Sequence, residues 1–166
     1  MEEREIAVYE RLRSMSIEYE RYEHPAPNTM EDCFEIDKKI GIMHCKNLFL
    51  CNRTKTQFYL LLIMGDKRFH TATVSKLLGI SRLSFSSAEQ MRDKLNVLPG
   101  AVSPMGLIFN REHDIHVVID DGILNEERVL VHPCVATASI ALTPDSILRF
   151  IDDCGNSSTI ITLPYE

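Results

Sequence analysis

Two apolar runs in the segment KNLFLCNRTKTQFYLLLI (residues 46–63) limit most strongly what this chain can fold into. Both runs are short and rich in aromatic and branched side chains, which favours β-strands over helices. The polar stretch Asn52–Lys55 between them predicts a turn, so the segment predicts a hairpin within a sheet. A lysine and an asparagine, Lys46 and Asn47, stand at the open end of this apolar hairpin.

The rest of the chain mixes helical and extended patterns. Apolar residues at helical spacing predict helices at 2–14, 30–40, 71–79, 86–95 and from Thr143–Pro144 to a stop at Gly155. Short apolar or alternating runs predict strands at 17–22, 83–85, 107–109, 115–119, 129–131, 136–142 and 159–163. The fold class we expect is α+β, with a mixed and strongly curved sheet, because strict βαβ alternation is missing.

Local signals fix some element ends. Thr29–Asp32 resembles a capping box and Gly41 supplies a stop, which bounds the second helix. Ser86–Glu89 predicts a capping box that opens the fourth helix. The stretch Leu98–Gly106 carries two prolines and two glycines, so it predicts a shaped loop.

Composition indicates an ordinary globular chain. A length of 166 residues with 45% hydrophobic content predicts one domain that covers residues 1–166. The net charge of −6 gives no general attraction to nucleic acid, so a nucleic-acid partner must be held locally. No stretch approaches the roughly 18 apolar residues that cross a bilayer, and the start of the chain is charged and amphipathic. We therefore expect a cytoplasmic protein with no membrane partner.

Most signatures of catalysis are missing from the sequence. It contains no G-x-S-x-G elbow, phosphate-binding loop, G-x-G-x-x-G or H-E-x-x-H, which disfavours hydrolysis by a protein nucleophile. His113 and His116 are two candidate metal ligands, but near a strand such residues more often face apart, so we expect no metal. The five cysteines include no C-x-x-C, which indicates reduced thiols. Cys45 beside His44 is better interpreted as a small buried thiol than as a nucleophile.

Three polar features lie among apolar neighbours. They are Lys46–Asn47, the loop GAVSPMGL that begins at Gly100, and His132–Pro133 at a strand end. A few polar groups converging on apolar walls are typical of a small-molecule site. The structural alternative is that Lys46 extends to solvent, Asn47 caps a turn and His132 is a hydrogen-bonded core histidine.

At these residues the sequence resembles the YbaK/prolyl-tRNA synthetase-associated editing domain superfamily, and more closely its free-standing ProX (PrdX) branch of Ala-tRNA(Pro) deacylases. The resemblance covers nearly the whole chain and includes the segments YERLRSMSIEYERYEHP, HCKNLFLCNRTKTQFYLLLI, LPGAVSPMGLIFN and VLVHPCVATASIALT. Its specific motifs are K-N-L-F-L, the G-x-x-x-P loop from Gly100 to Pro104, extended to S-P-x-G-L, and H-P. Ala136 stands where the family commonly has asparagine.

This resemblance implies a mixed, barrel-like β-sheet flanked by helices and hydrolysis of the ester that joins a wrong amino acid to the 3′ end of tRNA. Lys46 would anchor the terminal adenosine and its phosphate, Asn47 would assist, and His132 would shape the amino-acid pocket. The loop would offer backbone N–H groups to the aminoacyl carbonyl. The loop residues implied to bind substrate are Gly100, Val102, Ser103, Pro104 and Gly106. No metal or organic cofactor is implied.

The expected substrate and partner is the 3′ end of mischarged tRNA(Pro), with prolyl-tRNA synthetase or another translation factor as a further candidate partner. Three alternatives stay open at this point. The first is Cys-tRNA(Pro) as the substrate, as in the YbaK branch. The second is a non-catalytic module of the same fold that binds tRNA or a synthetase. The third is an α+β ligand-binding protein outside this family.

Overall fold

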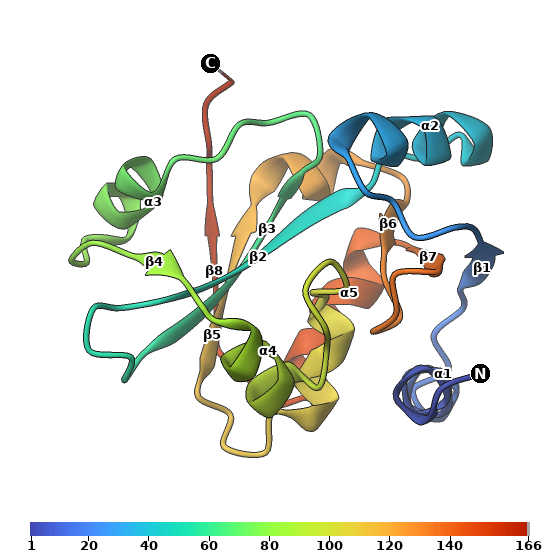
Figure 1. Cartoon of the computed structure of the whole chain (residues 1–166), viewed down its shortest axis with the longest axis horizontal. Coiled ribbons are helices and arrows are strands. Elements are labelled where there is room, and N and C mark those ends of the chain that lie inside the picture. The colour runs from blue at the N-terminus through green and yellow to red at the C-terminus, as the bar shows by residue number, and fades with distance from the viewer. Residues whose placement is uncertain (166) are drawn as a thin grey trace.

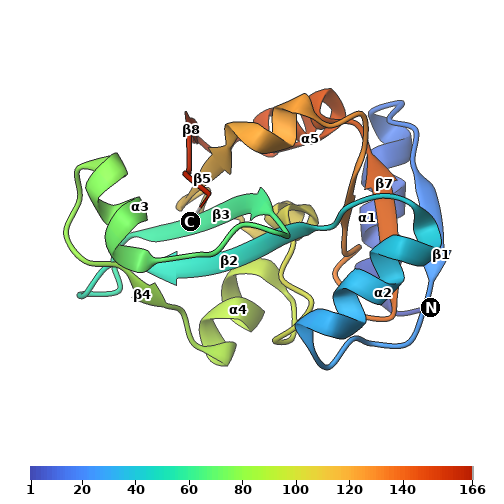
Figure 2. The same cartoon turned by 90° about the horizontal axis from the view of Figure 1, so that it is seen from above.

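The computed structural model describes residues 1–165 and has two open β-sheets with helices around them (Figures 1 and 2). The larger sheet has the strand order β4-β2-β3-β5-β8, and the smaller has the order β1-β7-β6. Their strands are β1 (Glu20–Glu23), β2 (Cys45–Cys51), β3 (Phe58–Met64), β4 (Ser84–Phe85), β5 (Ile115–Asp120), β6 (Val129–Val131), β7 (Ala138–Leu142) and β8 (Ser158–Ile161).

The predicted hairpin is confirmed as β2 and β3. The two strands are antiparallel, with Cys45 opposite Met64 and Cys51 opposite Phe58. Every residue of β3 is buried, because β2 and β5 flank it and apolar side chains cover both faces. The side-chain oxygen of Asn52 accepts the N–H groups of residues 56 and 57, which closes the turn.

The mixed α+β class is confirmed, but the expectation of a strongly curved, barrel-like sheet is wrong. β3 and β5 pair in parallel while β2 and β3 pair antiparallel, so the larger sheet is mixed. The outer strands of this sheet, β4 and β8, do not pair with each other, and the other three strands form a separate sheet. A barrel needs its first and last strands to pair, so neither sheet is closed.

Within the described residues 1–165, five α-helices and two short 3-10 helices lie around the sheets. The α-helices are α1 (Glu3–Ser14), α2 (Met30–Ile40), α3 (Thr71–Leu78), α4 (Ala88–Leu95) and α5 (Pro144–Asp153), and the 3-10 helices are η1 (Pro104–Phe109) and η2 (Asp121–Asn125). α2 begins as predicted, because the Thr29 hydroxyl accepts the N–H of Asp32, and it ends at Gly41 with φ +83°. No helix among residues 1–165 is long and apolar enough to cross a membrane.

The structure corrects two local predictions. The segment 107–109 is the end of the 3-10 helix η1 and not a strand, because the Ser103 hydroxyl accepts the N–H of Met105 and Pro104 starts a tight turn. The capping box of α4 is formed by Ser87 and Gln90, one position after the predicted pair. The Ser86 N–H instead bonds the carbonyl of Phe49 in β2.

Strand ends differ from the prediction by a few residues. β1 occupies 20–23 where 17–22 was expected, β7 begins at Ala138 instead of residue 136, and β8 covers 158–161 instead of 159–163. Strand pairing sets these ends: Glu23 is the last residue of β1 opposite β7, and it faces Ala138.

The core lies on both faces of the larger sheet. Side chains alternate along β3, so that Leu60 and Leu62 join one apolar cluster and Leu61 and Ile63 join the other. The first cluster includes buried residues of α1, α4 and α5, and the second includes Val74 of α3. The packing on both faces of the larger sheet fixes the position of β2, whose first residues contact the smaller sheet.

Candidate functional site

The start of β2 and the strand β6 meet at a junction between the two sheets. His44 forms a parallel bridge with Leu130, and the Leu130 N–H donates to the carbonyl of Met43 at 3.2 Å. The junction brings the lysine–asparagine pair of β2 close to the histidine–proline pair that follows β6. α2 lies beside this junction (Figure 2).

A small pocket of about 40 Å³ opens at the junction. Residues from α2, β2, β6, β7 and the segment after β1 form its wall. They are His24, Pro27, Cys33, Ile36, Asp37, His44, Cys45, Leu130, Val131, His132 and Ser139. The wall combines apolar side chains with three imidazoles, a carboxylate and a hydroxyl, a composition typical of small-molecule sites.

Lys46 and Asn47 extend from opposite faces of β2. Cys45 lies in the same apolar cluster as Phe49, and the Asn47 amide donates to the carbonyl of Cys45 at 3.0 Å. The ammonium of Lys46 donates to the carbonyl of Lys67 at 2.8 Å. Because an ammonium has three N–H groups, two remain for another acceptor.

The electrostatics of Lys46 connect it to the pocket wall. Partial burial lowers the pKa of Lys46. Burial also raises the pKa of the Cys33 thiol, and the nearby charge of Lys46 opposes that rise without cancelling it. Cys33 lies in the pocket wall, whereas Lys46 is not among the described residues that line it.

His132 lies in the pocket wall and is held by the backbone. Its Nδ1 lies 2.8 Å from the carbonyl oxygen of Ala138, so Nδ1 carries the proton and donates. Burial lowers the pKa of His132, which keeps the ring neutral near pH 7. Ala136, which replaces the common family asparagine, packs partly buried against the larger apolar cluster.

The loop from Gly100 to Gly106 does not line this pocket. Ser103 is fully buried and caps η1, and a Cβ on Gly106 would lie 2.7 Å from the carbonyl oxygen of Leu95. Among residues 1–165, no polar contact joins the loop to Lys46, Asn47 or His132. Val102 shares the apolar cluster that contains Cys45 and Val131, and Pro104 is buried beside it.

The backbone of this loop nevertheless offers donors. In the described chain, the amide N–H groups of Gly100, Val102 and Ser103 donate to no protein acceptor. Gly100 has φ +92°, a left-handed conformation that glycine adopts at low cost. Gly100 is exposed, so water can bind its amide, whereas Val102 and Ser103 are buried. Unpaired amides at buried positions are rare, and they are suited to bind an oxygen atom from a ligand.

Two polar pairs in the pocket wall were missed by the sequence interpretation. His44 Nδ1 lies 2.6 Å from the carboxylate of Asp37, and His24 Nε2 lies 2.7 Å from the hydroxyl of Ser139. The second pair joins residues 115 positions apart in the sequence. The burial of Asp37 is known only from the structure, and an unpaired buried carboxylate is costly, which explains its bond to His44.

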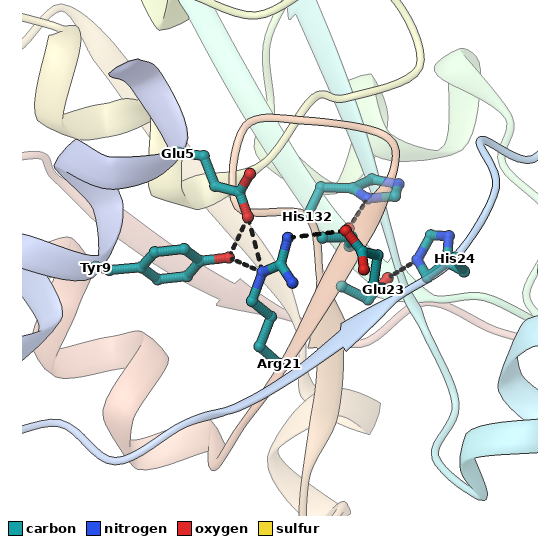
Figure 3. Close-up of polar contacts among 8 residues, drawn as sticks. Glu5, Tyr9, Arg21, Glu23, His24 and His132 are labelled. Carbon is teal, nitrogen blue, oxygen red and sulfur yellow. Dashed lines mark hydrogen bonds and ion pairs between the residues drawn. The ribbon is translucent and has the colours of Figure 1, made fainter. Parts of the chain in front are cut away.

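A network of hydrogen bonds and ion pairs holds β1, the strand that directly precedes His24 (Figure 3). The guanidinium of Arg21 lies 2.9 Å from the buried carboxylate of Glu5, which also accepts the hydroxyl of Tyr9 at 2.5 Å. Burial, followed by the bond to Glu5, raises the pKa of Tyr9, so the phenol stays protonated. These contacts tie β1 to α1 and fix where His24 lies.

Cys45 and His116 are both held in structural surroundings. Cys45 is buried as predicted, and burial raises its pKa, which disfavours the thiolate. His116 uses both ring nitrogens on the hydroxyls of Ser157 and Thr159. Within residues 1–165, no group of three His, Cys, Asp or Glu residues is placed to hold a metal ion.

Comparison with known proteins identifies the family. A family model described as the aminoacyl-tRNA editing domain matches residues 24–150, which include the pocket and the loop. This chain belongs to the aminoacyl-tRNA editing domain family. The expected resemblance to the YbaK/ProX group is thereby confirmed.

Relatives of this editing domain match it over almost their full length. The prolyl-tRNA synthetase associated domain-containing protein 1 of Bos taurus is 30% identical over 159 residues, covering 93% of this chain and 92% of the relative. The prolyl-tRNA editing protein ProX of Acetoanaerobium sticklandii is 29% identical over 157 residues, covering 95% and 96%.

Solved structures share the fold of this editing domain. A crystal structure of a candidate trans-editing enzyme for prolyl-tRNA synthetase aligns with a TM-score of 0.73 at 18% identity, and the alignment covers 99% of both chains. A structure of the hypothetical protein APE2540 aligns with a TM-score of 0.71 at 17% identity over 91% of this chain and 95% of that one.

Proposed function

We propose that this editing domain is a trans-acting deacylase that hydrolyses the ester between alanine and the 3′ end of tRNA(Pro). The observation that carries the proposal is the small mixed pocket at the sheet junction, with His132 in its wall, in a chain of the editing-domain family. Similarity along the full length of ProX, which is named a prolyl-tRNA editing protein, supports the same conclusion.

The size of the pocket supports alanine as the amino acid. The pocket is small, with a volume of about 40 Å³, and most of its exposed wall is apolar, which suits the methyl group of alanine. A synthetase site built for proline discriminates poorly against a smaller amino acid, because a missing methylene changes binding by only ~1–3 kcal/mol. A second pocket that excludes proline by size can then hydrolyse the wrong product.

The lysine and the asparagine of β2 have binding roles in this proposal. Lys46 directs its two unused N–H groups to the phosphate of the terminal adenosine, and Asn47 assists from the neighbouring position. His132 stays neutral and shapes the wall around the amino acid. A few such contacts hold the tRNA end to a chain of net charge −6, so binding should weaken as salt rises.

The loop at Gly100–Gly106 has the role of stabilising developing charge. The unpaired amides of Gly100, Val102 and Ser103 would donate to the aminoacyl carbonyl oxygen as it becomes an oxyanion. Removal of one such donor typically costs on the order of 10²–10³ in rate. Pro104 and Gly106 hold the loop in shape, since η1 begins at the proline and the glycine fits against α4.

The site of action follows from this substrate. Mischarged tRNA(Pro) is a product of prolyl-tRNA synthetase, so we propose that the domain acts in the cytoplasm, near that synthetase or another translation factor. Residues 1–166 would carry this activity as one unit.

The test is the release of amino acid from charged tRNA by the purified protein. We expect rapid release of alanine from Ala-tRNA(Pro) in the presence of a chelator, and intact Pro-tRNA(Pro) in the parallel reaction. Release of cysteine from Cys-tRNA(Pro), with Ala-tRNA(Pro) left intact, would show that the domain acts on Cys-tRNA(Pro) and not on Ala-tRNA(Pro). Release of neither amino acid would overturn the deacylase proposal and favour a non-catalytic tRNA-binding or synthetase-binding module.

A further inference from the structure

A carboxylate–imidazole pair lies in the pocket wall and has no role in the proposed function so far. Asp37 is the buried residue of α2, and its Oδ2 lies 2.6 Å from Nδ1 of His44. A carboxylate accepts, so Nδ1 of His44 carries the proton and the neutral ring has its lone pair on Nε2. Within residues 1–165, no protein group binds Nε2, so this nitrogen can accept a proton from a ligand or a water.

The ring of His44 is held in a defined orientation. A Cβ at Gly65 would lie 2.4 Å from Cε1 and 2.5 Å from Nε2 of the ring, so only glycine leaves the space that the imidazole occupies. On another side, the ring of Phe34 meets it edge-on, with 5.6 Å between the ring centroids. The hydrogen bond to Asp37 and these two contacts fix which way Nε2 points. Such fixed orientation is what a proton-transfer group requires.

The three histidines of the pocket differ in their capacity to accept a proton. His24 uses Nδ1 on the carbonyl of Pro25 and Nε2 on the hydroxyl of Ser139, so neither nitrogen is free. His132 has a free Nε2, but its partner is a neutral carbonyl, and burial lowers its pKa. His44 has a carboxylate partner, which stabilises the positive charge that forms when the ring takes up a proton.

We propose that His44 is the general base of the deacylation and that Asp37 is its positioning residue. This inference rests on the deacylase function proposed above. Nε2 of His44 takes a proton from a water molecule as the water oxygen bonds to the carbonyl carbon of the aminoacyl ester. The bond between that carbon and the ribose oxygen then breaks, and the proton on His44 passes to the leaving ribose oxygen. The products are the free amino acid and the intact tRNA end.

The groups that face His44 define what its pH dependence would reflect. From α2 these are Asp37 and Cys33, from β2 Cys45, and from the other walls His24 and His132. Burial raises the pKa of both thiols, so they remain neutral near pH 7. Titration of these thiols should therefore not contribute to the pH dependence of kcat near pH 7.

The test measures single-turnover deacylation of Ala-tRNA(Pro) by the full-length protein across pH. H44Q should lower the rate constant about 10²-fold or more, since general base catalysis contributes about 10²–10⁴-fold, and it should remove the acidic limb. D37N should lower the rate less, about 10-fold, and move that limb. H44A should regain part of its activity when free imidazole is added, which a purely structural role would not produce. H116Q is the matched control, because His116 lies outside this pocket, and it should leave rate and profile unchanged.

The outcomes separate this inference from the proposed function. Absence of release by the wild-type protein would overturn both. Release by the wild type with an unaltered rate and profile in H44Q would overturn the inference alone, and would favour activation of the water by a ribose hydroxyl of the substrate. If H44Q shows no cooperative unfolding on heating, this variant is not folded. The rate constant and the pH profile of D37N then decide the question in the same way.

Discussion

At the scale of single residues, Lys46 is placed by one contact that the sequence does not reveal. Its ammonium bonds the carbonyl of Lys67, twenty-one positions further along the chain. This bond fixes the side chain while two N–H groups stay unused, and partial burial strengthens any ion pair that they form with a phosphate. The bond to Lys67 gives Lys46 a structural role, and its role in substrate binding stays a prediction.

Replacement of this lysine should affect function far more than stability. We expect K46A to lower kcat/KM for Ala-tRNA(Pro) about 10²-fold or more. The logarithm of the tRNA binding constant should also fall less steeply with the logarithm of salt concentration, by the contribution of about one phosphate contact. The free energy of unfolding should change by only about 1 kcal/mol, the usual contribution of one hydrogen bond. K76A serves as the control, because Lys76 is exposed on α3 and should tolerate the change. An unchanged deacylation rate in K46A would contradict the proposed role of Lys46 in binding the substrate.

At the scale of elements, a buried ion pair joins three segments of the larger sheet. The ammonium of Lys67, just after β3, lies 2.9 and 3.1 Å from the two carboxylate oxygens of Asp120 at the end of β5. It also donates to the carbonyl of Leu163, beyond β8, at 2.8 Å. Since the backbone of Lys67 holds Lys46, this ion pair also supports the candidate site.

Breaking this pair should destabilise the protein strongly. We expect D120N to lower the free energy of unfolding by about 3–5 kcal/mol, because it leaves the charge of Lys67 buried without its partner. Urea denaturation monitored by circular dichroism measures the change. D153N is the matched control: Asp153 pairs with Arg11 at 2.9 Å on the surface, and its loss should cost less than about 1 kcal/mol. Equal effects of the two variants would contradict the role given to the buried pair.

At the scale of the whole molecule, two histidines make stability depend on pH. Burial lowers the pKa of both His116 and His132 below the ordinary value of 6.5. As the pH falls below that value, the unfolded chain binds protons that the folded chain does not. Stability contributed by the neutral rings is therefore present above the unfolded pKa and is lost as the pH falls toward the folded values.

Acidification should accordingly lower the thermal midpoint of the protein. We expect the midpoint to fall between about pH 7 and pH 5, because proton uptake by the unfolded state favours unfolding in this range. H116Q should reduce the slope of the unfolding free energy against pH, since it removes one of the two groups. A midpoint that rises on acidification, or a slope that H116Q leaves unchanged, would contradict this account.

Much of the fold could be predicted because its signals are local. The apolar runs that became β2 and β3, the threonine and glycine that bound α2, and the proline that opens α5 each act within a few residues. The segment 107–109 shows where such signals fail. Its three apolar residues suit a strand, but the cap by Ser103 and the close packing of Gly106 on Leu95 favour a 3-10 helix.

The sequence by itself determined the α+β class, the central hairpin and the family, because periodicity and motifs are properties of neighbouring residues. Only the tertiary structure decided that the sheets stay open, that β2 and β6 meet, and that Asp37 and His24 belong to the pocket wall. Strand order and the pairing of Ser139 with His24 depend on contacts between distant segments. Such contacts form when the whole core packs, and no local pattern specifies them.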